Sequence, residues 1–303
     1  MGYLEDMYKR ASSGFSELHS GVTDLVLTDF PDHANVGDSA IFLGEHSFWQ
    51  TNNIDVHSIY SLQVAKPSIY DSQVPVFIHG GGNLGDLYPI HNEHRYKLAE
   101  NLRDDTLLVQ YPQSVHFSTK EARLEFDSRM AKRSQLRIAV RDNESYKLLE
   151  SSVSDLYLIP DAVHLLGKIP SAEPHKSKIR LLRQDSETTG SLNNNDARDW
   201  GGDGFLVAAS WWLSWRSYNL GVGQAAFHRG NQWWLSRAEK RFLRGVELLA
   251  SAEVVETDRL HAMLIALQLG RKVIVHDNAQ GKISKYVKTW FTDFHPENLV
   301  VKF

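Results

Sequence analysis

The sequence contains no cysteine, which excludes disulfide bonds, thiolate metal sites and a cysteine nucleophile and fits a reducing compartment. It also lacks any apolar run near the roughly 18 residues that a membrane-spanning helix needs, and its polar start does not resemble a signal peptide. A basic excess is missing too, since 33 Lys and Arg face 37 Asp and Glu, which argues against nucleic acid as a partner. We therefore expect a folded cytoplasmic protein.

The chain is long enough for two domains. Its 303 residues are more than a single hydrophobic core usually organises, and they suit two domains of about 150 residues each. Residues 167–178 are polar, contain two prolines and hold few apolar side chains, which is typical of a linker. We predict domains at 1–168 and 169–303.

Short apolar segments alternate with helical ones in both halves. We expect strands at 24–30, 54–60, 74–79, 106–110, 136–140, 156–159, 179–183, 204–210, 253–256 and 271–276. We expect helices at 39–50, 89–103, 118–132, 143–151 and 261–269. This alternation predicts an α/β fold with doubly wound parallel sheets, whose ligands bind where the strands end.

Residues 253–286 hold the clearest candidate site. If Thr257 or Asp258 caps the following helix, then Arg259, Leu260 and His261 lie at its N-terminus, where backbone N–H groups and the helix dipole favour an anion. Lys282 follows the next strand, and neighbouring parallel strands end at the same sheet edge. Arg259, His261 and Lys282 could converge on one anionic ligand. The alternative is a capped helix beside a surface lysine.

Two loops share the pattern Asn-x-Gly-Asp, at 35–38 and 83–86, each after an apolar strand. Such loops can approach and hydrogen-bond a ligand hydroxyl, with Asp38 also a natural helix N-cap, or they can simply be turns. The glycines at 80–82 lack the spacing of dinucleotide-binding and Walker motifs. Arg141 ends a strand and could grip a carboxylate or phosphate, or pair with Asp142 or Glu144.

Three further groups have weaker interpretations. His91, Glu93 and His94 provide too few ligands with a set geometry, so we expect no metal. The tryptophans between 211 and 234 could stack on sugars, form an interface or fill the core. Residues 185–203 suggest a functional loop. A basic helical stripe is expected to be solvated and could attract anionic lipid or a diphosphate: Arg237, Lys240, Arg241 and Arg244.

Taken in order, the motifs resemble the polysaccharide pyruvyltransferase family. The matching segments are NVGDSAI (35–41), GGGNLGDLYP (80–89) with Arg95, QYPQS (110–114), RDNES (141–145), Pro160-Asp161, DRLHA (258–262) and GKIS (281–284). They extend over nearly the whole chain in the family's order.

The resemblance implies a GT-B-like architecture, in which two doubly wound domains face a cleft. Phosphoenolpyruvate would be held mainly on the C-terminal domain, by Arg259, Leu260, His261 and Lys282, with Arg141 reaching across the cleft from the N-terminal domain. The glycan acceptor would lie on the N-terminal domain, near Asn35, Asn83, Tyr88, Arg95 and Gln113. His261 would act as the acid, with Asp38 or Asp86 as hydroxyl base, and no cofactor is needed beside the co-substrate phosphoenolpyruvate.

The reaction so implied transfers pyruvate from phosphoenolpyruvate to hydroxyls of a sugar in a polysaccharide or its lipid-linked precursor. It forms a pyruvate ketal and releases phosphate, as in exopolysaccharide biosynthesis. A lipid-linked oligosaccharide acceptor would place the protein in peripheral contact with the inner face of the membrane. The alternatives are a GT-B-type glycosyltransferase that uses a nucleotide sugar and a non-catalytic glycan-binding module that uses the tryptophans.

Overall fold

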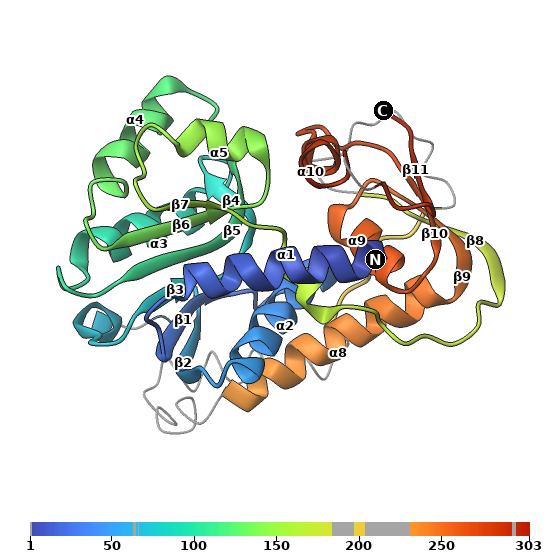
Figure 1. Cartoon of the computed structure of the whole chain (residues 1–303), viewed down its shortest axis with the longest axis horizontal. Helices are drawn as coiled ribbons and strands as arrows, with labels where there is room; N and C mark the ends of the chain where they lie inside the picture. The colour runs from blue at the N-terminus through green and yellow to red at the C-terminus, as the bar shows by residue number, and fades with distance from the viewer. Residues whose placement is uncertain (1, 63–64, 66, 184–196, 204–230, 293–294) are drawn as a thin grey trace.

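Two parallel sheets organise the computed structural model of the chain, which describes residues 2–62, 65, 67–183, 197–203, 231–292 and 295–303 (Figure 1). The first sheet has seven strands in the order β2-β1-β3-β5-β6-β7, with β4 paired to β5, and the second has four in the order β11-β10-β9-β8. All these strand pairs are parallel. The predicted α/β class with parallel sheets is confirmed.

The first sheet comprises β1 (Asp24–Phe30), β2 (Asp55–Ser61), β3 (Val76–Ile78), β4 (Gly81–Gly85), β5 (Leu108–His116), β6 (Leu136–Val140) and β7 (Leu156–Leu158). The second comprises β8 (Lys176–Leu181), β9 (Ala252–Thr257), β10 (Lys272–Val275) and β11 (Leu299–Val301). The strand expected at 204–210 lies outside the described residues. The apolar runs predicted strands well because helices cover both faces, so that β1, for example, is buried at every residue after Asp24.

The helices are α1 (Tyr3–Leu18), α2 (Val36–Thr51), α3 (Pro89–Asn101), α4 (Lys120–Arg129), α5 (Asn143–Leu149), α8 (Asn231–Ala250), α9 (Leu260–Gln268) and α10 (Lys282–Trp290). Two short 3-10 helices, η1 (Pro67–Asp71) and η2 (Ala162–Leu166), complete the described elements. Helix α1 and strands β4 and β11 were not predicted from the sequence. Among the described helices, none has the length and apolar character that crossing a bilayer requires.

Helix α2 is packed so closely that several of its contacts need glycine. A Cβ at Gly44 would overlap the carbonyl of Ala162 in η2, and one at Gly245 of α8 would overlap the side chain of Val36. One hydrophobic core accordingly runs through the chain, from α1 and β1 through α2 to α9 and β10.

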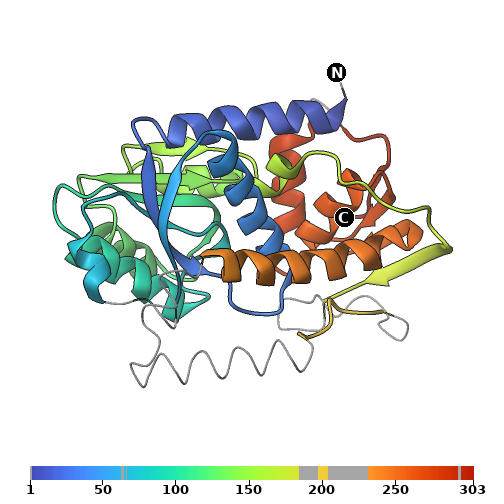
Figure 2. The same cartoon turned by 90° about the horizontal axis from the view of Figure 1, so that it is seen from below.

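Helices α1 and α8 both extend from the side of the first sheet to that of the second (Figures 1 and 2). Helix α8 is anchored to the first sheet by Trp234, whose Nε1 donates a hydrogen bond to the carbonyl of Ile59 at 3.0 Å. Its other contacts include α2, α9 and β9. A helix from the second half of the sequence is therefore built into the packing of the first sheet.

Candidate functional site

A cavity of about 250 Å³ is formed where segments from both sheets meet. Its walls come from the loop after β1, the start of α2, the glycine segment after β3, the end of β6 and the starts of α9 and α10. Nine of the candidate residues line it: Asn35, Asp38, Asn83, Tyr88, Arg141, Arg259, Leu260, His261 and Lys282. The structure thus brings most of the expected donor and acceptor residues into one space.

The buried group at the centre of the site joins Arg141, Asp161 and His261. Asp161 Oδ2 accepts a hydrogen bond from Arg141 Nη1 at 2.6 Å and lies 3.1 Å from His261 Nε2. Arg141 is 2% exposed and pairs with neither Asp142 nor Glu144, because Asp142 instead caps α5. Burial alone would raise the pKa of Asp161, but His261, Arg141 and a backbone N–H outweigh it and hold that pKa well below its usual range.

The cations Arg141 and Lys282 approach each other beside Gly82. A Cβ on Gly82 would lie 2.8 Å from Arg141 Nη2 and 3.6 Å from Lys282 Nζ. Both cationic side chains therefore reach the same part of the cavity, one from the end of β6 and one from the start of α10. Their convergence suits a ligand with more than one negative charge.

The start of α9 differs in detail from the prediction. Arg259 is the N-cap residue, and neither predicted cap acts as one: Thr257 Oγ1 accepts from Arg259 N at 3.1 Å, while Asp258 accepts from Arg183 N. The Arg259 guanidinium donates to Asp199 at 2.7 Å. Asp199, the neighbouring cavity residue Trp200 and Arg183 were not anticipated, because nothing in the sequence near them forms a motif.

The first turn of α2 carries Asp38 into the cavity. Asn35 caps the helix, in place of the predicted Asp38, by accepting from Gly37 N at 2.9 Å, and its amide donates to Asp38 at 2.8 Å. Burial would raise the pKa of Asp38, but the cationic groups around it, first His33 and then His261, lower it overall. Asp38 is therefore ionised near neutral pH and able to accept a proton.

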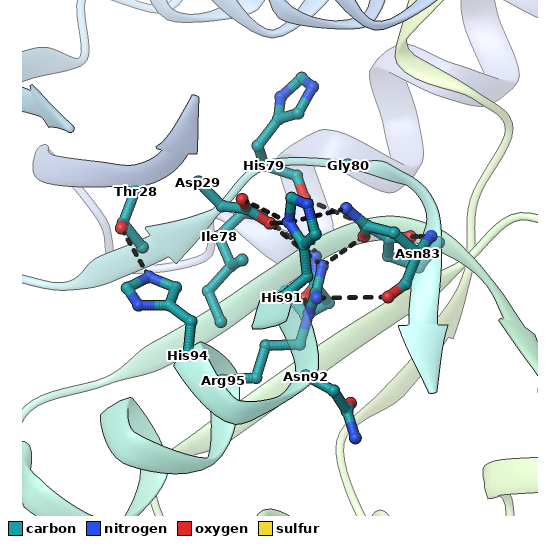
Figure 3. Close-up of polar contacts among 12 residues, drawn as sticks. Thr28, Asp29, Ile78, His79, Gly80, Asn83, His91, Asn92, His94 and Arg95 are labelled. Carbon is teal, nitrogen blue, oxygen red and sulfur yellow. Dashed lines mark hydrogen bonds and ion pairs between the residues drawn. The ribbon is translucent and has the colours of Figure 1, made fainter. Parts of the chain in front are cut away.

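The acceptor-side wall is held from behind by a buried network (Figure 3). Arg95 is fully buried and donates to Asn83 Oδ1 at 2.6 Å, while Gln113 Oε1 accepts from Asn83 N at 2.9 Å. Neither Arg95 nor Gln113 lines the cavity, so both act on it through lining residues: Asn83 for both, with Asp29 for Arg95 and the His79 carbonyl for Gln113. Asp29, which has a φ of 62° and was not predicted, accepts from His91 Nδ1 at 2.8 Å on the same wall.

His91 and His94 do not form a metal cluster with Glu93. His94 bonds Thr28 Oγ1 at 2.8 Å, and Glu93 pairs with Arg129. Within the described parts of the chain, no group of three or more His, Cys, Asp or Glu side chains could hold a metal ion.

Two expectations about charged residues are corrected by the structure. Asp86 does not line the cavity: its carboxylate accepts from the backbone N–H and the hydroxyl of Ser118, so it is unsuited to activate a substrate hydroxyl there. Arg237 and Arg241 are buried rather than solvated, because both pair with Asp32 and Arg241 also pairs with Asp203.

Most of the tryptophan-rich segment, including Trp211, Trp212 and Trp215, lies outside the described residues. Of its described members, Trp234 is buried in the core, and Trp233 lies under the Arg237 guanidinium, 3.9 Å from the ring centroid. The described part of the segment therefore supports the core interpretation. Among the described tryptophans, Trp200 lines the cavity, near the end of the loop predicted to be functional.

Comparison with known proteins gives a consistent result. The sequence model of a family described as polysaccharide pyruvyl transferase matches residues 35–279. The chain is 30% identical over 297 residues to pyruvyl transferase 1 of Schizosaccharomyces pombe, covering 91% of this chain and 72% of that protein. It is 25% identical over 296 residues to the putative pyruvyl transferase EpsO of Bacillus subtilis, covering 93% and 90%. The crystal structure of an uncharacterised Klebsiella pneumoniae protein shares the fold, with a TM-score of 0.65, 15% identity and 98% coverage of both chains.

Proposed function

Because the chain belongs to the polysaccharide pyruvyl transferase family, and is thus an enzyme of pyruvyl transfer onto polysaccharide, we propose that its donor is phosphoenolpyruvate. The products would be a pyruvate ketal on a sugar and free phosphate. The observation that carries this proposal is the convergence of Arg141, His261 and Lys282 on a cavity that also contains the ionised Asp38. No metal or resident cofactor takes part in it.

The donor has two anionic groups, a carboxylate and a phosphate, so its binding needs several cations or N–H donors. Arg141 and Lys282 supply charge from one side of the cavity, while Arg259 and the N-terminus of α9 supply it from another. In this proposal residues 1–168 provide the acceptor side and 169–303 the donor side, with Arg141 reaching across. Fixed cations of this kind stabilise the charge that develops on the departing phosphate.

The chemistry that we propose begins with protonation of the donor methylene carbon. His261 gives a proton to C3, whose double-bond electrons form the new C–H bond and leave positive charge at C2. A sugar hydroxyl then attacks C2 while Asp38 takes its proton. A second hydroxyl displaces phosphate, which leaves with the electrons of the C–O bond and takes up the second hydroxyl proton. Asp161 and Arg141 hold the His261 ring in place throughout.

The acceptor proposed is a glycan of a polysaccharide or of its lipid-linked precursor. A lipid-linked acceptor would bring the protein to the inner face of the membrane, in the cytoplasm. The buried Arg237 and Arg241 are not available for that contact, so it would have to use other parts of the surface.

The test is phosphate release from phosphoenolpyruvate across a panel of galactosyl, glucosyl and mannosyl acceptors, with the ketal identified by mass spectrometry. We expect release that depends on acceptor and falls at least about 10²-fold in His261→Ala, the usual scale for loss of a general acid. His261→Ala should still bind phosphoenolpyruvate through Arg141 and Lys282. An enzyme that releases no phosphate with any acceptor but retains a labelled sugar nucleotide would refute the proposed donor and support a glycosyltransferase.

A further inference from the structure

His79 is a buried residue of the cavity wall that the proposed chemistry leaves unused. It follows β3, is 4% exposed and is held from one side by Glu45 of α2, whose Oε2 lies 2.9 Å from His79 Nδ1. Glu45 is itself fully buried, and its other oxygen accepts from Gly80 N at 2.9 Å. The ring is therefore locked at Nδ1, and its orientation is fixed.

The other ring nitrogen, His79 Nε2, has no hydrogen-bond partner among the residues that the structure describes. A buried nitrogen left without a partner costs about 1 to 3 kcal/mol, so native proteins rarely keep one without a reason. Because His79 lines the cavity, a ligand bound there can supply the missing partner once the atoms that cover Nε2 move aside. The ring points away from the cluster of Asp29, His91 and Arg95 (Figure 3), so such a contact would be separate from that cluster.

The charges that face His79 decide which kind of ligand fits. Burial, the largest effect, lowers the pKa of His79, but the carboxylates of Glu45, Asp38 and Asp29 together raise it above its usual value. Nε2 therefore tends to carry a proton and to donate. Since Asp38 and Asp29 also line the cavity there, an anionic oxygen would be repelled and an uncharged oxygen is favoured.

We propose that His79 is an acceptor-binding residue, whose Nε2–H donates a hydrogen bond to a hydroxyl of the incoming sugar, with Glu45 as the positioning residue that holds the ring. This inference rests on the proposed function, because it assigns a contact to the acceptor of that reaction. It adds no covalent step. It also gives the buried pair of Glu45 and His79 a role beyond joining α2 to β3.

Two substitutions distinguish the contributions of the two ring nitrogens of His79. His79→Asn places an amide near the Nδ1 position and keeps the contact with Glu45, but removes the cavity nitrogen. His79→Gln places an amide near the Nε2 position. We expect His79→Asn to lower kcat/KM for the acceptor about tenfold or more, as for a lost hydrogen bond from a charged group. The KM for phosphoenolpyruvate should stay within about twofold, and His79→Gln should recover part of the loss.

The pH profile gives a second measurement that a purely structural role would not change. In the wild-type enzyme kcat/KM for the acceptor should fall as rising pH removes the Nε2 proton. In His79→Asn the decline should be shallower, because only the part that is due to the proposed acid His261 remains. His94→Gln is the matched control, because His94 bonds Thr28 and does not line the cavity. Its kinetics should match those of the wild type.

Three outcomes would count against the assignment. A His79→Asn enzyme with wild-type kcat/KM for the acceptor would overturn it, and so would a variant that loses affinity for phosphoenolpyruvate and acceptor equally. A wild-type enzyme without acceptor-dependent phosphate release would overturn the proposed function together with this contact. Turnover in the wild type with an unaffected His79→Asn would overturn the contact alone.

Discussion

Replacing Gly37 with alanine tests whether the fit between α2 and α9 sets the position of His261. The added Cβ would overlap His261 Nδ1 and would lie 2.8 Å from His261 Cγ and 2.9 Å from its Cβ. Heavy atoms in ordinary contact are about 3.5 Å apart, so the ring would have to move by about 1 Å. Because His261 Nε2 lies 3.1 Å from the buried Asp161 carboxylate and 3.2 Å from the Arg141 guanidinium, that movement would disrupt the hydrogen bond that Nε2 makes to one of them.

The expected effect falls on activity more than on stability. Displacement of a reacting group by about 1 Å can cost about 10²-fold in rate, and we expect kcat of Gly37→Ala to fall by about that factor. The overpacking costs about 1 to 3 kcal/mol. Part of this is offset because alanine favours a helix over glycine by about 1 kcal/mol. The free energy of unfolding should therefore change by no more than about 2 kcal/mol.

The assay is acceptor-dependent phosphate release, measured together with urea unfolding. Gly44→Ala is the stability control on the same helix, since its Cβ would strike the Ala162 carbonyl, next to Asp161, and should lower stability while placing no atom against His261 itself. Gly2→Ala, which has open space around it, should change neither. A Gly37→Ala enzyme with wild-type kcat would refute the reasoning. An unfolding midpoint as low as that of Gly44→Ala would show that the helix, and not the ring, had moved.

Three further predictions concern charge. Asp86→Asn should keep wild-type kcat, because Asp86 bonds Ser118 away from the cavity. A loss of about 10²-fold in kcat would instead support Asp86 as the base that activates the sugar hydroxyl. Arg241→Met should lower the free energy of unfolding in urea by about 1 to 3 kcal/mol, since Asp32 and Asp203 each lose one buried donor although each keeps a second arginine. The same variant should sediment with anionic vesicles as the wild type does, whereas weaker sedimentation would restore the lipid-binding interpretation. Acid should destabilise the protein between pH 6.5 and about 4, because burial lowers the pKa of three histidines from 6.5 to about 4: His19, His94 and His164. The unfolded chain binds protons there that the folded chain resists, so the urea midpoint should fall across this window, although the raised pKa of His79 acts in the opposite direction. A constant midpoint would contradict the prediction.

The strands were predictable because parallel strands buried on both faces are apolar runs in the sequence. Helix α1 was not predicted although Met7, Ala11, Phe15 and Leu18 form a buried stripe at helical spacing, because polar and charged residues separate them and leave no continuous apolar run.

The site was only partly predictable, and the two Asn-x-Gly-Asp patterns show why. The first begins helix α2 and places Asp38 in the cavity, whereas the second ends β4 (Gly81–Gly85) and directs Asp86 to Ser118. The same Asn-x-Gly-Asp pattern thus adopts two different backbone conformations, which depend on contacts with residues distant in the sequence. Asp161 belonged to a recognised motif, but its pairing with Arg141 and His261 joins residues 20 and 100 positions apart.

The long helix α8 connects the two sheets mechanically. Trp234 and Arg241 attach it to the first sheet, at Ile59 and Asp32, while its other end leads directly into β9 of the second sheet. Wide parting of the two sheets would break these buried contacts. An N-terminal fragment that ends between the two sheets would lack α8 and would expose the apolar surface that α8 covers. Such a fragment should aggregate when it is produced alone.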